Sequence, residues 1–193
     1  MAKNAFAKTF LTITLLVLVI SSFSLSANPI DNIELVVSRS AHPLSVKQGD
    51  VTLNTFKVAF GSGGKKGKLK EGDHTTPKGT YLINKIRDSE NFHLFMLLNY
   101  PNMDDAKRAL KNHLISRKQY RAIFLAQIEG RLPPQNTALG GSIGIHGIGI
   151  ETKDKLEIHR YADWTKGCIA MRNDEVEALR RYISQGTKVT IAD

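Results

Sequence analysis

The chain has a single cysteine, Cys168, which stands between Gly167 and a short apolar run at residues 169–171. One cysteine cannot close a disulfide within its own chain, so this thiol is an apolar core residue, half of an intermolecular bridge, or a nucleophile. The preceding glycine and a glycine-flanked histidine upstream, His146, favour the nucleophile. The chemistry that such a pair predicts is acyl transfer through a thioester.

Among the six histidines, His146 is the best candidate for activating the thiol. A thiol is a weak nucleophile until it loses its proton, and a nearby imidazole can take that proton and lower the pKa of the thiol. The flanking Gly144 and Gly147 let the backbone approach a second segment and leave room for a substrate. His159, nine residues before Cys168, is a candidate for a structural or substrate contact. The other histidines are expected to be ordinary surface or partly buried residues: His42, His74, His93 and His113.

The turn before the cysteine is a candidate oxyanion hole. Backbone N–H groups beside a nucleophile can point at the oxygen that becomes negative during acyl transfer, and each such donor contributes on the order of 3 kcal/mol. We expect the amide of Cys168, together with that of Gly167 or Lys166, to have this role. The alternative is that Gly167 only permits the turn, and both interpretations can hold together.

A metal site formed by His146, His159 and Cys168 is conceivable from the residue types alone. Their spacing matches none of the recurrent zinc patterns, and no second cysteine is present. Because thiol acyl transfer requires neither a metal nor an organic cofactor, we expect none.

The elements that position these residues are predicted to be mostly strands in one domain. Runs with strand character lie at residues 33–37, 44–47, 53–60, a segment ending at 86, 93–98, the segment that carries His146, and 188–191. The basic, glycine-rich residues 61–68 lack the spacing of a phosphate-binding loop and are expected to form a mobile hairpin loop. The predicted fold is therefore mainly β, with helices inserted around the strands.

Two segments have helical character. Residues 102–129 begin with Asn102 and Asp105, which can cap and charge a first helical turn, and the C-terminal stretch 174–183 follows a possible N-cap at Asn173. Within the first segment, an i, i+4, i+8 stripe is expected to pack against the core. This stripe comprises Tyr120, Phe124 and Ile128.

The N-terminus has the layout of a secretory signal peptide. Lys3 and Lys8 precede an apolar run at residues 10–20, and small residues follow up to Ala27. The run is shorter than the roughly 20 residues that span a bilayer, so an uncleaved membrane anchor is the minority alternative. We expect a signal peptide at residues 1–27 and one domain at residues 28–193, exported to the periplasm or cell wall.

The formal net charge of the chain is +9. In an exported protein, this charge is consistent with simple solubility or with attraction to an anionic bacterial envelope. Nucleic acid is not an expected partner, since the chain shows no module of basic and aromatic residues and carries an export signal.

Two motifs together resemble the signature of the L,D-transpeptidase catalytic domain, which joins a His-Gly element to a Ser/Thr-x-Gly-Cys element. Residues 143–147 read IGIHG, and residues 165–169 read TKGCI. The segment from Gly72-Asp73 through TPKGTY at 76–81 is similar to a further family segment, as is LGGS at 139–142. The resemblance covers roughly residues 33–193.

The resemblance implies a β-sandwich or barrel that acts on peptidoglycan, with an inserted helical segment at 102–129 and a C-terminal helix. In this family the cysteine attacks the L-to-D peptide bond before the terminal D-alanine of a stem peptide, and an amine of another stem resolves the acyl-enzyme. By position, Cys168 would be the nucleophile and His146 the general acid and base. Carbonyls near Gly147 would orient the imidazole.

This chain departs from the family pattern beside the cysteine. Lys166 stands where many members have histidine, and Ala170 stands where arginine is common. Arg172, two residues further on, is a candidate for binding a substrate carboxylate.

Three functions remain open from the sequence. A transferase and a hydrolase share the first half-reaction and differ in whether an amine or water resolves the thioester. The hydrolase would trim stem peptides or release a wall-anchored protein, and such a protein is also a candidate acceptor. The third function is a non-catalytic wall-binding module, in which Cys168 would be inert.

Overall fold

The structure is a computed structural model, and it describes residues 32–193. The expected signal peptide at residues 1–27 lies outside the described residues. Within residues 32–193, no helix is both long enough and apolar enough to cross a membrane.

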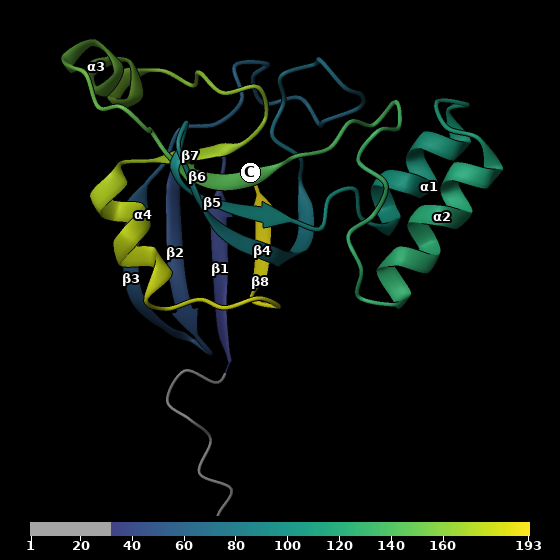
Figure 1. Cartoon of the computed structure of the whole chain (residues 1–193), viewed down its shortest axis with the longest axis horizontal. Coiled ribbons are helices and arrows are strands. Elements are labelled where there is room, and N and C mark those ends of the chain that lie inside the picture. The colour runs from purple at the N-terminus through teal and green to yellow at the C-terminus, as the bar shows by residue number, and fades with distance from the viewer. Residues whose placement is uncertain (1–31) are drawn as a thin grey trace, which may run out of the picture.

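Eight strands of the described chain form one mixed sheet in the order β3-β2-β1-β8-β4-β5-β6-β7 (Figure 1). The strands are β1 (Ile33–Ser38), β2 (Pro43–Gln48), β3 (Val51–Lys57), β4 (Gly79–Ser89), β5 (His93–Leu98), β6 (Gly144–Gly147), β7 (Ile169–Met171) and β8 (Lys188–Ala192). The pairs β1–β8 and β6–β7 are parallel, and the other neighbours are antiparallel. These elements confirm the predicted mainly β fold.

The long strand β4 joins the two halves of the sheet. Its first residues pair with β8, and its later residues pair with β5. One core cluster contains buried side chains from both halves, such as Leu35 of β1 and Met96 of β5. The halves therefore share a single hydrophobic core, which fixes β6 and β7 relative to the rest of the domain.

The predicted helical stretch 102–129 forms two helices, α1 (Met103–Lys111) and α2 (Arg117–Ile128), which lie beside the sheet (Figure 1). Asn102 caps α1 by accepting hydrogen bonds from the amides of Asp104 and Asp105, and the Asp105 carboxylate accepts from the Asn102 amide. Ser116 caps α2 in the same reciprocal way with Gln119. These boxes satisfy amides that have no partner within the helix.

The predicted core stripe of α2 is confirmed for Tyr120, which packs against the core cluster, and is wrong for Phe124 and Ile128. Phe124 is 39% exposed and Ile128 is 66% exposed, whereas the buried residues of α2 are Ile123 and Ala126. Apolar residues at helical spacing identify a face of a helix, but they do not show which of two neighbouring faces meets the core.

Two further helices flank β7. Helix α3 (Lys153–Tyr161), which the sequence analysis did not predict, begins at the N-cap Thr152. Helix α4 (Asn173–Arg180) has Arg172 at its N-cap, not Asn173 as predicted. The amide group of Asn173 instead bonds both backbone groups of Gly149, with distances of 3.1 Å and 2.7 Å.

Candidate active site

The register between β6 and β7 places the two candidate catalytic residues on one face. His146 pairs with Ala170 and Ile145 with Ile169, so Cys168, the residue before β7, continues the ladder beside Gly144. Side chains alternate between faces along a strand, and paired residues share a face. Ile145, Ile169 and Met171 belong to the core cluster. Cys168 and His146 therefore lie together on the opposite face.

Glycines allow close packing around this pair. A side chain at Gly144 would meet the Phe95 ring at 2.8 Å, and one at Gly147 would meet the carbonyl of Phe92 at 2.7 Å. Because the residues that flank His146 have no side chain, the segment that contains Phe92 and Phe95 can pack closely against the strand that carries the imidazole.

The imidazole of His146 is enclosed by aromatic rings. Phe95 stacks at 6.0 Å and 11°, Phe92 lies at 4.3 Å, and Trp164 meets the ring edge-on at 6.1 Å. The side chain is only 2% exposed. Burial, together with a smaller effect of nearby His159, lowers the pKa of His146 to about 4, although its hydrogen bond to Gly147 acts in the opposite direction. The imidazole is therefore neutral at pH 7.

Nδ1 of His146 bonds the carbonyl oxygen of Gly147 at 2.7 Å. A carbonyl can only accept a hydrogen bond, so Nδ1 carries the ring proton. Nε2 of the neutral ring is then an unprotonated base that can accept a proton.

Cys168 is partly buried, and its thiol donates to the carbonyl of Ser142 at 3.4 Å. Burial raises the pKa of the Cys168 thiol, although the backbone amide of Gly144 and the ammonium of Lys68 oppose this effect. This direction is the opposite of the lowering that an ion pair with a protonated His146 would produce. The resting pair consists of a thiol and a neutral imidazole, since both charged forms are disfavoured by burial.

The turn before Cys168 is fixed by Thr165. Its hydroxyl donates to the carbonyl of Cys168 at 2.7 Å and accepts from the amide of Gly167 at 3.1 Å. Gly167 adopts φ +129°, which side chains rarely allow. Because the Gly167 amide donates to Thr165, the amides of Lys166 and Cys168 are the better candidates for an oxyanion hole.

His159 reaches the site through Trp164. The indole Nε1 donates to Nδ1 of His159 at 3.3 Å, and the two rings meet edge-on at 6.5 Å. Burial lowers the pKa of His159, and the cations of Lys57 and Arg172 lower it further. A neutral His159 thus accepts from the indole that packs against His146.

Arg172 continues the alternation of Cys168 and Ala170 along β7. Its side chain is exposed, and Nε lies 3.3 Å from a carboxylate oxygen of Asp174. Arg172 therefore lies beyond Ala170, on the same face as the thiol, and not directly beside it.

The loop at residues 61–78 forms a wall next to β7. The hydroxyl of Thr76 accepts from the amide of Gly61 at 2.9 Å and donates to the carbonyl of Cys168 at 3.5 Å. Asp73 accepts hydrogen bonds from Lys68 and from backbone amides of this loop, so a partly buried ion pair holds the loop in place.

Sequence reasoning missed several residues that position the candidate pair. They are Phe92, Phe95, Ser142, Trp164 and Thr165. One available signal was that Trp164 is the only tryptophan and stands four residues before the cysteine.

Within residues 32–193, no group of three His, Cys, Asp or Glu side chains is arranged to hold a metal ion. His159 instead bonds an indole, and Cys168 bonds a backbone carbonyl. These contacts give no support to the metal site considered from the residue types.

Comparison with known proteins identifies the domain. A model of the L,D-transpeptidase catalytic domain matches residues 32–191. None of the curated proteins compared matches the chain.

Several solved structures share the fold. Bd1075 of Bdellovibrio bacteriovorus is 20% identical with a TM-score of 0.51, and the match covers 83% of this chain and 47% of that one. The helical cell shape determining protein Pgp2 of Campylobacter jejuni is 19% identical with a TM-score of 0.54, covering 82% of this chain and 46% of that one. An L,D-transpeptidase of Mycobacterium smegmatis is 13% identical with a TM-score of 0.47, covering 83% and 58%. The match thus spans about half the length of these proteins.

Proposed function

Because the chain belongs to the L,D-transpeptidase catalytic-domain family, we propose that it is a cysteine acyltransferase acting on stem peptides of peptidoglycan. The observation that carries this proposal is the β6–β7 register, which puts Cys168 and His146 on the same face and away from the core. The hydrogen bond from His146 to Gly147 supports the role of the imidazole, since it leaves Nε2 as a proton acceptor.

In the first half-reaction, Nε2 of His146 takes the thiol proton as the sulfur of Cys168 attacks the carbonyl carbon of the L-to-D bond. The amides of Cys168 and Lys166 are the proposed donors to the oxyanion. Collapse of the tetrahedral intermediate breaks the C–N bond, and the imidazolium gives its proton to the departing amine of D-alanine. The product is a thioester on Cys168.

In the second half-reaction, an amine of a neighbouring stem attacks the thioester while His146 accepts its proton. The C–N bond of the cross-link forms, the C–S bond breaks, and the thiolate recovers a proton from the imidazolium. If water takes the place of the amine, the same intermediate gives a trimmed stem peptide.

The hydrolase alternative uses the same residues, and a wall-anchored protein is a further proposed substrate or acceptor. The hydrophobic cage of Phe92, Phe95 and Trp164 favours the transferase, because it shields His146 from water in the resting protein. A non-catalytic binding module would have no use for a histidine held in one tautomer on the same face as a thiol.

Stem peptides occur outside the cytoplasm, so we place the protein in the periplasm or cell wall. The N-terminal pattern of residues 1–27 and the net charge of +9 agree with this placement. No metal or organic cofactor is required by the proposed chemistry.

Mass spectrometry of a synthetic tetrapeptide with a penultimate diamino acid and a terminal D-alanine tests the reaction. We expect loss of D-alanine, and a cross-linked dimer would identify the transferase where a trimmed monomer would identify the hydrolase. The variant Cys168→Ala should retain the fold, as followed by circular dichroism, and should release no D-alanine. Turnover by this variant would contradict the proposal.

A further inference from the structure

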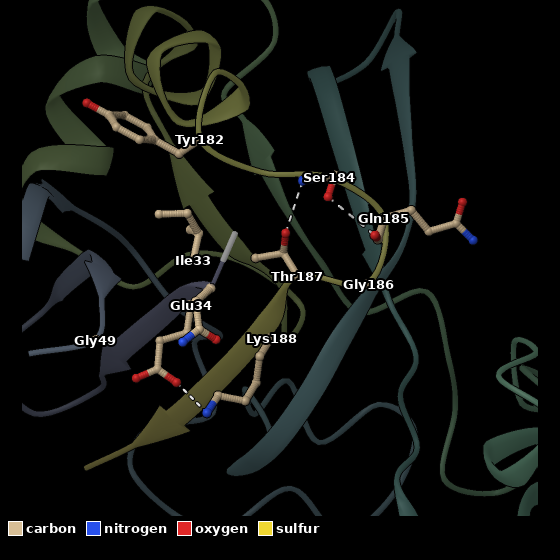
Figure 2. Close-up of a pocket in the computed structure, with 10 residues that line it drawn as sticks. Ile33, Glu34, Gly49, Tyr182, Ser184, Gln185, Gly186, Thr187 and Lys188 are labelled. Carbon is tan, nitrogen blue, oxygen red and sulfur yellow. Dashed lines mark hydrogen bonds and ion pairs between the residues drawn. The ribbon is translucent and has the colours of Figure 1, made fainter. Parts of the chain in front are cut away.

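A cavity of about 210 Å³ lies between α3, the end of β3 and the start of α4. Its lining residues are Lys57, Leu156, His159, Arg160, Arg172 and Glu175. A different cavity, of about 610 Å³, lies where β1 and β8 begin, and none of its lining residues comes from β6 or β7 (Figure 2). The smaller cavity reaches the chain just after β7 through Arg172.

The sheet register relates this cavity to the thiol. Ala59 forms an antiparallel bridge with Ala170, so counting two residues outward places Lys57 beside Arg172. Arg172 comes four residues after Cys168 and shares its face, which at about 3.3 Å per residue corresponds to roughly 13 Å along the strand. Lys57 and Arg172 therefore lie at one end of the face of the sheet that carries His146, and the thiol of Cys168 lies towards the other end.

The cavity carries more positive than negative charge. Lys57, Arg160 and Arg172 line it, and Glu175 is the one carboxylate among its lining residues. The carboxylate of Glu175 already has a partner, because it accepts a hydrogen bond from the backbone amide of Arg172 at 3.2 Å. Burial also raises the pKa of Glu175. Within residues 32–193, the guanidinium of Arg160 makes no ion pair, so it has donors to offer a ligand.

Two contacts organise the cationic groups. The ammonium of Lys57 donates to the carbonyl of Arg160 at 2.9 Å, which ties β3 to α3. His159 lines this cavity and also accepts a hydrogen bond from the indole of Trp164. The same helix, α3, therefore supplies a cation to the cavity and a partner to the ring that packs on His146.

We propose that this cavity binds a free carboxylate of the peptide whose bond Cys168 attacks. This inference rests on the proposed function, which supplies an anionic peptide. A guanidinium can hold a carboxylate with two parallel hydrogen bonds, and a nearby ammonium adds a third donor.

The separation from the thiol indicates which carboxylate is bound. The terminal carboxylate of the departing residue lies within one residue of the attacked carbonyl, or about 3.5 Å of extended chain. The backbone of Arg172, which lines the cavity, is roughly 13 Å from that of Cys168 along the strand, a distance that long cationic side chains shorten only in part. An internal carboxylate on the acyl-donor side, one to three residues from the attacked bond, matches this separation better.

Calorimetric titration of the Cys168→Ala protein tests the cavity without requiring turnover. The probes are the tetrapeptide, the same peptide with its internal carboxylates converted to carboxamides, and the peptide amidated only at its C-terminus. We expect the internal carboxamides to raise the Kd about 10- to 100-fold, and the C-terminal amide to change it less than threefold. Charge-assisted hydrogen bonds of this kind account for the expected size.

Added to the Cys168→Ala protein, Arg160→Gln should raise the Kd for the carboxylate peptide by a similar factor. It should cause no further loss with the internal carboxamide peptide, because the same interaction is then already absent. Lys155→Gln is the matched control, since it removes an exposed cation from α3 that does not line the cavity. Circular dichroism of each variant verifies the fold.

Equal Kd values for the carboxylate and internal carboxamide peptides would overturn the proposal, as would equal effects of Arg160→Gln and Lys155→Gln. A loss confined to the C-terminal amide would overturn the assignment to an internal carboxylate. The proposed function is judged separately by D-alanine release from the wild-type protein. Charge-dependent binding without release would support the cavity and contradict the acyl transfer.

Discussion

Nδ1 of His146 is 2.7 Å from the carbonyl oxygen of Gly147, the next residue in the chain. This short-range bond fixes the tautomer of the imidazole without an acidic partner. A carboxylate in that position would favour the imidazolium and raise the pKa, whereas a neutral carbonyl inside an aromatic cage leaves the ring neutral. The proposed base is therefore ready to accept a proton at neutral pH.

The first prediction concerns the pH dependence of turnover. Since His146 must be neutral to accept the thiol proton and its pKa is about 4, kcat/KM for D-alanine release should be level from about pH 6 to 8 and should fall tenfold per pH unit below about 4. The measurement is initial velocity at low substrate concentration across that range, in buffers of constant ionic strength. A fall centred near pH 6.5, the ordinary histidine value, would show that the free imidazole is not held neutral.

The sequence pointed to the two proposed reacting groups because their chemistry is carried by residue type and by the nearby glycines. It could not show that Cys168 and His146 share a face, since that depends on the parallel pairing of β6 and β7. The aromatic cage was also beyond its reach. Phe92 and Phe95 come from β5 and the turn before it, and only the pairing of β5 with β6 brings them to His146.

Predictions from the sequence agreed with the fold where they rested on local patterns, and they failed where packing between elements decides which side chains are buried. The strand patterns and the cap at Asn102 were confirmed, because alternation and capping are local properties. The predicted burial of Phe124 in α2 was wrong, since Ile123 is buried in its place. Helix α3 has no strong apolar stripe, and of its residues only His159 is buried.

The second prediction concerns stability in acid. Unfolded His146 takes up a proton near pH 6.5 but the folded residue does so only near pH 4, so the unfolded state binds more protons between these values. Stability from this group is full above pH 6.5 and decreases as the pH falls to 4, by about 3 kcal/mol in total.

Urea unfolding at pH 7 and pH 4.5 measures this effect. The variant His146→Gln, which cannot titrate, should lose less stability than the wild type between the two values. Asp73 does not affect this comparison, because the stability that comes from its lowered pKa is present in full above its ordinary value of 3.8 and is lost only as the pH falls from there towards about 2. Equal losses in both proteins would contradict a neutral buried His146.

The third prediction concerns the ion pair of Lys68 and Asp73. Lys68 is 4% exposed and its ammonium lies 2.8 Å from Asp73. Although burial opposes ionisation of Asp73, hydrogen bonds from Lys68 and from the loop amides hold its pKa at about 2. Asp73→Asn leaves a buried ammonium without its counter-charge, so it should lower the free energy of unfolding by about 3–5 kcal/mol.

Lys68→Met should cost less, because Asp73 keeps its bonds to the amides of Leu69, Lys70 and Thr75. The double variant should lose less free energy of unfolding than the two single variants lose together. Urea unfolding of the wild type, the two single variants and the double variant measures this coupling energy. Additive changes below about 1 kcal/mol each would mean that the pair contributes little to the loop.

The fourth prediction tests whether the loop at residues 61–78 must pack tightly against the turn before Cys168. A Cβ at Gly61 would lie 2.1 Å from the carbonyl oxygen of His74 and 3.0 Å from Cα of Gly167. Gly61→Ala therefore has to displace one of these backbones, which should cost about 1–3 kcal/mol of stability and lower kcat more than KM changes. Gly67→Ala in the same loop is the matched control, because a Cβ there meets nothing within 4 Å. Thermal unfolding and D-alanine release measure both effects, and a Gly61→Ala protein as stable and active as the Gly67→Ala protein would show that the wall can move without consequence for the thiol.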